Sequence, residues 1–274
     1  MTVNPFLDPA ARGILYGTAD RLARRTTALL TAKIAGGNAA DTIAGLAASA
    51  LAPLPAGVAV LDVGCGRGST TRRLADSLAP TRVVALDAAP ALLADARLEC
   101  CSSSRIAHVC GDFHRLPFAD HKFGLTIAAF CLYHSPTPHH VVAELARCLT
   151  AEGVLVAATK SAGSYRELDH LVAAARLDPD AERRPSLYQA FHSDNMAEII
   201  AASLTVEQVW HEVHRFRFRD LAHFASYLST TPKYHLPVHV SASPTVLARA
   251  LAAAIDDGPV ETTSTVSYAV ARKR

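Results

Sequence analysis

Short apolar runs alternate with amphipathic stretches through the middle of the chain. Five such runs lie at residues 58–63, 82–87, 106–110, 125–132 and 154–159. Continuous apolar runs of this length are typical of strands that are buried on both faces of a sheet. Segments with apolar residues at helical spacing lie between them, at residues 69–79, 89–99 and 139–149. This alternation predicts a parallel sheet with helices on both faces.

The pattern changes at both ends of the chain. Residues 1–55 contain two or three helical segments, and residues 161–192 a helical segment with a proline-interrupted loop. Alternating stretches at residues 205–218 and 263–271 predict two more strands. We therefore expect a single Rossmann-like α/β domain over residues 1–274, with a seven-stranded, mostly parallel sheet. Its expected parts are an N-terminal helical lid, a cofactor-binding core, a helical insertion forming part of a substrate cap, and the C-terminal part of the core, at residues 1–55, 56–160, 161–192 and 193–274.

The composition narrows the classes of partner. Half of the 274 residues are apolar, the formal net charge is +2, and the 27 basic residues are scattered, so a footprint for nucleic acid is not evident. Lys33, Gly36, Gly37 and Asp41 interrupt the apolar stretch near the N-terminus, which argues against a membrane span. The six cysteines lack zinc-type spacing, and no secretory signal begins the sequence. We expect a cytoplasmic protein without disulfides, without a metal, and without a membrane or nucleic-acid partner.

A glycine-rich turn follows the first predicted strand. The segment 61–68 is Leu-Asp-Val-Gly-Cys-Gly-Arg-Gly, and a predicted helix follows it directly. Glycines allow a tight turn and let a ligand lie against the backbone. Ser69 stands where a dinucleotide fingerprint has Gly or Ala, and no phosphate-binding Gly-Lys-Ser/Thr follows. Asp87 ends the next strand, where a carboxylate can accept hydrogen bonds from ribose hydroxyls, so the pair predicts a site for a ribonucleoside without a diphosphate.

These motifs resemble those of the class I S-adenosylmethionine methyltransferases that act on small molecules. The resemblance runs from about Ala56 to Ala158. It also covers the stretches 116–124 and 149–155, where Gly124 and Glu152 depart from the common pattern. The family pattern implies that Asp62 orients the glycine turn and that Asp87 takes the ribose hydroxyls. The other cofactor-binding residues that the resemblance implies are Tyr16, Gly64, Cys65, Gly66, Gly68, Ala88, Asp112, Phe113 and Phe130.

Within this pattern, Asp112 would accept from the adenine amino group, Phe113 would present its backbone N–H to the ring, and Ala88 would lie near the adenine. Phe130 begins the segment that the family places beside the sulfonium. An aromatic residue from the N-terminal segment closes over the cofactor in similar enzymes, which points to Tyr16. The implied cofactor is S-adenosylmethionine.

His134 is the first candidate for a catalytic base or an acceptor-orienting group. It follows the fourth predicted strand, and an unperturbed imidazole has a pKa near 6.5, which suits proton transfer near neutrality. Candidate acceptor-pocket residues are His134 itself and Tyr133, Tyr188, His192 and Tyr234. We expect His114 to be exposed, and His139 and His140 to be surface residues rather than metal ligands.

The acceptor carries no motif in this sequence. A small molecule of specialised metabolism, methylated at N, O or C, is the favoured interpretation. A nucleic-acid methyltransferase, a non-methylating S-adenosylmethionine-binding protein or cyclase, and a nicotinamide-dependent oxidoreductase are the alternatives. The oligomeric state is left open, with a homodimer among the options.

Overall fold

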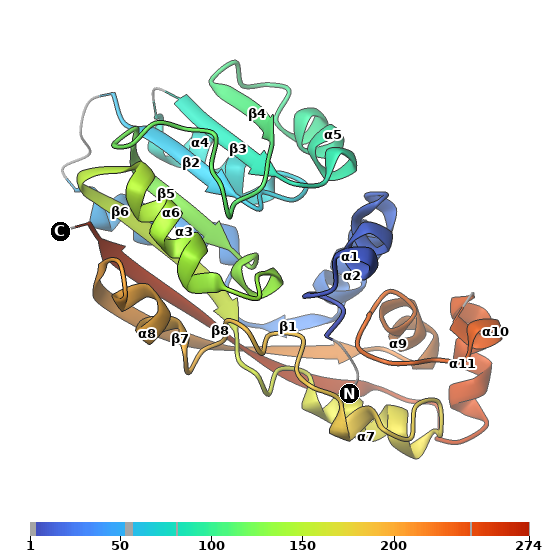
Figure 1. Ribbon diagram of the computed structural model, residues 1–274. Coiled ribbons are helices and arrows are strands. Elements are labelled where there is room, and N and C mark those ends of the chain that lie inside the picture. Colours follow the sequence, from blue (N-terminus) through green and yellow to red (C-terminus); the bar gives the residue numbers. More distant parts are fainter. Residues whose placement is uncertain (1–3, 53–56, 81, 242, 274) are drawn as a thin grey trace. The chain divides into compact units, whose positions relative to one another are not determined.

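The computed structural model describes residues 4–52, 57–80, 82–241 and 243–273, and it divides into two units (Figure 1). The core unit comprises Gly37–Ser161, Tyr188–His211 and Val266–Arg274. The accessory unit comprises Met1–Gly36, Ala162–Leu187 and Glu212–Thr265. The chain therefore passes between the units several times. The predicted division into lid, core, insertion and C-terminal part stays a prediction.

A mostly parallel sheet forms the centre of the core unit. Its parallel strands are β2 (Ala59–Val63), β3 (Arg82–Asp87), β4 (Ile106–Cys110), β5 (Phe123–Ala129) and β6 (Leu149–Lys160). β8 (Val260–Arg272) pairs antiparallel with β6, and β7 (Thr205–Phe218) lies next to β8. The full strand order is β1-β7-β8-β6-β5-β2-β3-β4. The order reverses at β2, which pairs with β3 on one side and β5 on the other, and ligands of open α/β sheets bind at the carboxyl end of such a strand.

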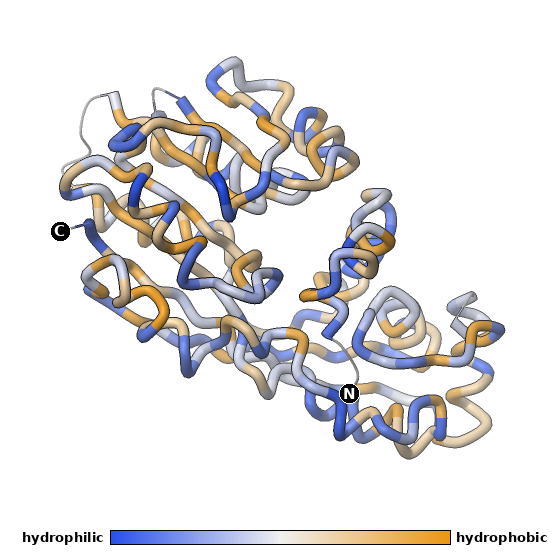
Figure 2. The backbone as a smooth tube through the Cα atoms, viewed as in Figure 1, coloured by the Kyte–Doolittle hydropathy of each residue, from blue (hydrophilic) through white to orange (hydrophobic). Residues whose placement is uncertain are grey.

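The apolar runs of the sequence form this sheet as predicted. The central strands are largely buried and predominantly apolar along their length (Figure 2). The core helices are α3 (Ala39–Ala50), α4 (Ser69–Leu78), α5 (Pro90–Glu99), α6 (Pro138–Cys148) and α8 (Met196–Ala201). α3 packs against α4, and α6 against α8. This confirms the Rossmann-like α/β class, with helices around a mostly parallel sheet.

α3 belongs to the core unit, although its residues fall within the predicted lid. Its apolar face buries Ile43, Ala44 and Ala47 in the same cluster as Val60 of β2 and Ile127 of β5. Burial of one isoleucine side chain contributes about 1.5–3 kcal/mol. α3 is therefore a structural layer of the core, and a lid role remains a prediction only for the residues before it.

The accessory unit is mainly helical. Its helices are α1 (Pro9–Tyr16), α2 (Asp20–Ala32), α7 (Arg166–Ala174), α9 (Leu221–Leu228), α10 (Val238–Ser241) and α11 (Pro244–Ala252). His223 of α9 lies 3.0 Å from both the Ala28 carbonyl and the Thr31 hydroxyl of α2, which ties these two helices together. Among the described residues, no helix is both long and apolar enough to cross a bilayer.

Within the described residues the sheet has eight strands rather than the predicted seven, because of β1 (Lys33–Ala35). The sequence predicts only helical segments over residues 1–55, but α2 ends at Ala32 and a short strand follows. Lys33 is extended and pairs antiparallel with Phe216 of β7. Pairing with β7 satisfies backbone groups that a continued helix would have satisfied internally, so tertiary contact outweighs local propensity here.

Candidate functional site

The glycine turn begins where β2 ends. Gly64, Gly66 and Gly68 have φ of 62°, 56° and 88°, all in the left-handed region that favours glycine. The N–H of Cys65 donates to the Leu86 carbonyl at 3.1 Å, and the Cys65 carbonyl accepts from Gly68 N at 3.0 Å. Cys65 thus contributes through its backbone, which joins the turn to β3.

The three glycines have different surroundings. A Cβ added to Gly64 would lie 2.4 Å from Cβ of Cys131, and one added to Gly68 would lie 3.1 Å from Cβ of Ala96. A Cβ added to Gly66 would meet no described atom within 4 Å. Gly64 and Gly68 therefore allow close packing within the protein, whereas Gly66 presents bare backbone to open space where a ligand can approach.

Asp87 closes the turn from the neighbouring strand. Its Oδ2 accepts from Gly66 N at 2.9 Å, and its Oδ1 accepts from Ala89 N at 2.8 Å. Burial raises the pKa of this carboxyl, while backbone N–H groups of Ala89, Gly66 and Ala88 oppose the shift. A carboxylate oxygen can accept more than one hydrogen bond, so both oxygens retain capacity for ribose hydroxyls. Ala88, beside it, is exposed.

Asp62 acts inside the protein. The carboxyl is buried in β2, and the Thr71 hydroxyl of α4 donates to Oδ2 at 2.6 Å. Burial raises its pKa to about 7; the Thr71 hydrogen bond lowers it and the charge of Asp87 raises it further. This bond fixes the first turn of α4 to β2, and the role of Asp62 in orienting the glycine turn stays a prediction.

Asp112 lies after β4 and is held by His114. Oδ1 of Asp112 accepts from His114 N at 2.9 Å and from His114 Nδ1 at 2.7 Å. The other ring nitrogen, Nε2, lies 2.8 Å from the hydroxyl of Ser135, which is fully buried and also accepts from Thr137 N at 3.0 Å. The expectation that His114 is an exposed residue is wrong: its side chain is 27% exposed and bridges the segments after β4 and β5.

The ring of Phe113 stands edge-on to the His114 ring, with centroids 4.7 Å apart. The position of the Phe113 ring is therefore coupled to that of His114, which bridges Asp112 and Ser135. Its predicted contact with an adenine stays a prediction.

Beyond β5 the chain changes direction at Phe130. Phe130 has a φ of 56° and donates its N–H to the Ala158 carbonyl at 2.8 Å, so the strand predicted through 132 ends at Ala129. A 3-10 turn (Leu132–His134) follows. Nδ1 of His134 lies 3.1 Å from the Cys131 carbonyl. Because a carbonyl only accepts, Nδ1 carries the hydrogen and Nε2 is the basic nitrogen of the neutral ring.

Aromatic rings gather beside His134. The Tyr133 ring lies 4.7 Å from the His134 ring and 5.0 Å from that of Tyr188, which it meets edge-on. Nζ of Lys160 lies over the rings of Phe130 and Tyr188, 5.9 Å and 5.5 Å from their centroids. Cation–π attraction holds such an ammonium beside the rings. We call Phe130, Tyr133, His134, Lys160 and Tyr188 the aromatic cluster.

Comparison with known proteins agrees with this geometry. A family described as a methyltransferase domain matches residues 61–157. The chain carries a methyltransferase domain. The resemblance to class I S-adenosylmethionine-dependent methyltransferases is thereby confirmed.

Two curated relatives are similar to this domain. A malonyl-acyl-carrier-protein O-methyltransferase of Marinomonas sp. (strain MWYL1) is 30% identical over 154 residues, covering 56% of this chain and 55% of that protein. A demethylmenaquinone methyltransferase of Bacillus licheniformis is 34% identical over 104 residues, covering 38% of this chain and 45% of that protein. The chain thus spans about half the length of these relatives.

Solved structures share the fold. A candidate methyltransferase from Bacillus halodurans C-125 has a TM-score of 0.60 at 19% identity, covering 86% of this chain and 99% of that one. The 4+2 cyclase SpnF has a TM-score of 0.53 at 20% identity, covering 85% of this chain and 80% of that one. At such identities the likeness establishes the fold alone.

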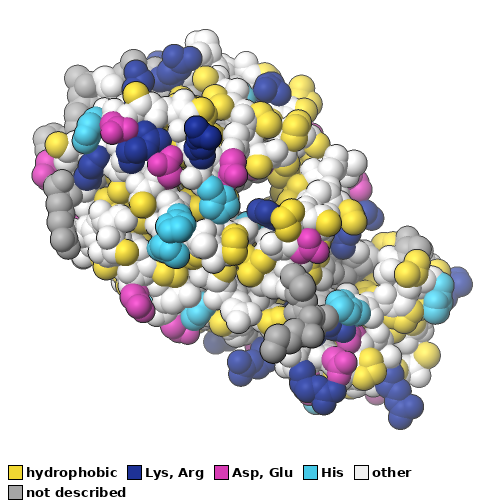
Figure 3. Space-filling view, in the orientation of Figure 1, with side chains coloured by type: hydrophobic (Ala, Val, Ile, Leu, Met, Phe, Trp, Pro, Cys, Tyr) yellow, Lys and Arg dark blue, Asp and Glu magenta, His cyan; other side chains and the backbone are white. Residues whose placement is uncertain are grey.

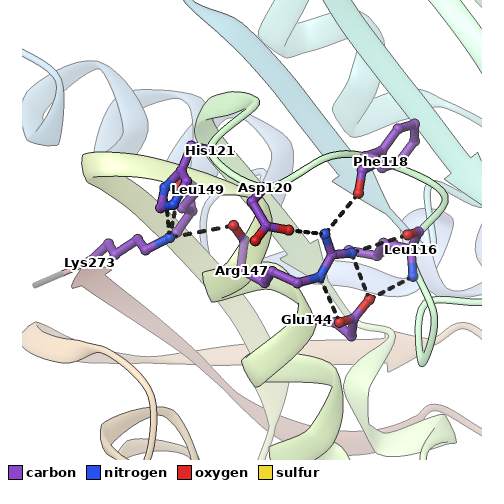
Figure 4. A network of polar contacts seen from close by, with 8 residues as sticks. All are labelled: Leu116, Phe118, Asp120, His121, Glu144, Arg147, Leu149 and Lys273. Carbon is purple, nitrogen blue, oxygen red and sulfur yellow. Dashed lines mark hydrogen bonds and ion pairs between the residues drawn. The ribbon is translucent and has the colours of Figure 1, made fainter.

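Within the methyltransferase domain, the loop at residues 116–124 is anchored to α6. Figure 4 shows the Arg147 guanidinium between the carboxylates of Glu144 and Asp120, while also donating to the carbonyls of Leu116 and Phe118. The Arg147 hydrogen bond is the main cause that lowers the pKa of Glu144. This network fixes the loop at residues 116–124, which gives that part of the motif a structural role.

The predicted pocket residues divide between the units. Tyr133, His134 and Tyr188 come together in the core unit, whereas Tyr16 and Tyr234 belong to the accessory unit. The His192 N–H donates to Oδ1 of Asn195 at 2.7 Å. Its neighbour Phe191 accepts the Thr159 hydroxyl at 2.7 Å, so this segment is tied to β6. The role of Tyr16 at the cofactor and those of His192 and Tyr234 at the substrate stay predictions.

Sequence reasoning missed Lys160. A lysine that ends an apolar strand resembles an ordinary solvated charge, and its neighbours Phe130 and Tyr188 lie 28–30 positions away. Its position at the carboxyl end of the fifth parallel strand, at the same edge as the glycine turn, was the available indication. His139 and His140 are exposed as predicted. Among the residues that the structure describes, no group of three or more His, Cys, Asp or Glu is arranged to hold a metal ion.

Proposed function

We propose that the protein transfers a methyl group from S-adenosylmethionine to an N, O or C atom of a small-molecule acceptor. The observation that carries this proposal is the pairing of Gly66 with Asp87: a bare backbone facing open space, held 2.9 Å from an acid on the adjacent strand. This arrangement lies at the switch point of the sheet, where a nucleoside would bind.

The residues around this edge fit the cofactor. Gly64, Cys65, Gly66 and Gly68 would border its amino-acid half, and Asp87 its ribose. Asp112, with Phe113 and Ala88, would border the adenine. S-adenosylmethionine supplies an electrophilic methyl group on a positively charged sulfur. The protein's contribution is to orient the acceptor and exclude water, which favours a displacement in which charge disperses.

The aromatic cluster is the proposed acceptor site. Nε2 of His134 would take a proton from a hydroxyl, phenol or carbon acid as the acceptor attacks. The bond from Nδ1 to the Cys131 carbonyl supports this role, because it selects the tautomer in which Nε2 is basic. An amine acceptor that attacks in its neutral form would need His134 only for orientation.

The charge distribution and the relatives both favour a small acceptor. Acidic and basic side chains are intermingled on the face seen in Figure 3. One relative is named for O-methylation of malonyl-acyl-carrier protein and another for methylation of demethylmenaquinone. A place in specialised metabolism, a cytoplasmic location and a homodimeric state are our expectations and stay predictions.

A 4+2 cyclase has the same fold, so a protein that binds the cofactor without transferring its methyl group is the second candidate function. Turnover with methyl-labelled S-adenosylmethionine separates the two functions. The protein would be incubated with a panel of phenols, carboxylic acids and amines. The label in each recovered acceptor and the S-adenosylhomocysteine formed would then be measured. Acceptor-dependent label supports the proposal; tight cofactor binding without any transfer across the panel supports the second candidate.

A further inference from the structure

The accessory unit contains a cavity. All of its lining residues belong to this unit, whereas the glycine turn belongs to the core unit. Its volume is about 260 Å³, slightly below the roughly 300 Å³ at which pockets for drug-sized ligands begin. Most of its wall is apolar and comes from two regions of the chain, with Pro5, Ile14, Leu15, Pro232 and Leu236 among the lining residues. A cavity of this size and lining suits a small ligand with a hydrocarbon body.

Arg21 supplies the charge of this cavity. Its Nε donates to the Thr230 carbonyl at 3.1 Å, which fixes the guanidinium plane. The two terminal nitrogens form no hydrogen bond or ion pair with any residue in the described part of the chain, and no acidic residue is among the residues lining the cavity. Burial lowers the pKa of Arg21, and the nearby charges of Arg25 and Arg24 lower it further. The positive charge is therefore uncompensated locally.

Tyr234, another lining residue, is held in place by a separate ion pair. Asp169 is buried; its Oδ1 accepts from the Tyr234 hydroxyl at 2.8 Å and its Oδ2 from Lys233 Nζ at 2.5 Å. The charges of Lys233 and Asp169 compensate each other, so they do not neutralise Arg21. Tyr234 is thus a fixed wall of the cavity, organised before any ligand arrives.

We propose that this cavity binds a small apolar monocarboxylate, with its carboxylate on Arg21 and its hydrocarbon body against the apolar wall. A guanidinium whose Nε is occupied still presents its two terminal amino groups as a fork that matches a carboxylate. The apolar residues that share the lining with Arg21 favour an anion that carries a hydrocarbon body over inorganic phosphate, which would leave them uncovered. Binding requires neither the cofactor nor the acceptor of the proposed methyl transfer.

Octanoate is the probe, with 1-octanol as the neutral analogue of the same chain length and inorganic phosphate as the anion without hydrocarbon. Calorimetry on the full chain, with methyl-labelled NMR of Ile14, Leu15 and Leu236, measures binding and locates it. We expect octanoate to bind the wild type at least tenfold more tightly than octanol or phosphate, with shifts at the three labelled side chains. Arg21→Met should weaken octanoate at least tenfold and leave octanol unchanged, and Arg21→Lys should give an intermediate loss.

Arg24→Met is the matched control, because Arg24 lies on the same helix but pairs with Asp20 at 2.9 Å on an exposed face. Its charge acts on Arg21 only from a distance, so octanoate should bind this variant within about twofold of the wild type. The proposal is overturned if octanoate does not bind at millimolar concentration, or if octanol or phosphate binds equally well. Equal losses in the Arg21→Met and Arg24→Met variants, or shifts away from the labelled residues, would also overturn it. Since no cofactor is added, these results are independent of the proposed methyl transfer.

Discussion

The backbone N–H of Gly66 lies 2.9 Å from Oδ2 of Asp87, so the glycine turn and the end of the adjacent strand form one unit. The N–H of Ala89 binds the other carboxylate oxygen and fixes its plane. The bend in the backbone and the acid are therefore positioned by each other before a ligand is present. Such preorganisation reduces the entropy that binding must overcome.

Substitution of Gly64 and Gly66 by alanine should have opposite consequences. The φ values of the two residues are similar, 62° and 56°, so a left-handed alanine costs about 1–2 kcal/mol at either position. Gly64→Ala also drives a Cβ against Cys131 and should cost about 1–3 kcal/mol more in unfolding free energy. Gly66→Ala should be the more stable variant and yet bind S-adenosylhomocysteine at least tenfold more weakly. Urea unfolding and calorimetry measure the two effects; equal stability of both variants would contradict this account of Gly64.

Asp62 predicts a pH dependence of stability. Its folded pKa of about 7 lies above the ordinary value of about 3.9, so the fold favours the protonated carboxyl. The contribution of this group is complete below about pH 4 and is lost as the pH rises through 7. The loss amounts to at most about 4 kcal/mol. Asp62→Asn keeps an acceptor for Thr71 but cannot ionise, so its unfolding free energy should fall less between pH 4 and 7 than that of the wild type. Parallel curves from urea titrations at several pH values would speak against a raised pKa.

His134 should affect the rate of transfer and leave cofactor affinity unchanged. For an acceptor that must lose a proton, His134→Asn should lower kcat about 10²–10⁴-fold, the usual contribution of a general base. The affinity for S-adenosylhomocysteine should stay within twofold of the wild type. Rates from labelled methyl transfer and affinities from calorimetry are compared on the same preparations. An unchanged kcat with such an acceptor would exclude a role as base.

His114 should act through Asp112. Removal of the ring in His114→Ala eliminates the side-chain hydrogen bond to Asp112 and leaves the buried Ser135 hydroxyl with the Thr137 N–H alone. A lost hydrogen bond of this kind costs about 1–3 kcal/mol. We expect weaker binding of S-adenosylhomocysteine, by about five- to tenfold, and little change in binding of its fragment methionine. His139→Ala, on an exposed ring, is the control and should behave as the wild type. An affinity equal to that control would show that Asp112 is positioned without His114.

The sequence was most informative where local pattern decides structure. Continuous apolar runs predicted the parallel strands, and the glycines together with Asp87 predicted which edge of the sheet is functional. β1 has only three residues and exists because Lys33 pairs with Phe216, so no period could reveal it. α3 is amphipathic like the helices before it, and only its burial with Val60 distinguishes a core helix from a lid.

The side-chain bridges were the least predictable part of the site. The sequence predicts an exposed His114, because its partner Ser135 lies 21 residues away and no local pattern indicates the contact. The position of the Lys160 ammonium likewise depends on the rings of Phe130 and Tyr188, which other segments of the chain contribute. Such contacts arise from the folded arrangement of loops, and residue type or spacing along one segment does not encode them.

The most direct test of the central claim is calorimetric titration of S-adenosylhomocysteine into the wild type, Asp87→Ala and Asp76→Ala, the last an exposed acid on α4. Two hydrogen bonds to a charged group contribute about 1.5–3 kcal/mol each. We therefore predict micromolar binding to the wild type and to Asp76→Ala, and affinity at least 100-fold weaker for a folded Asp87→Ala. Equal affinity of Asp87→Ala and the wild type, or no binding to the wild type at millimolar ligand, would contradict the account.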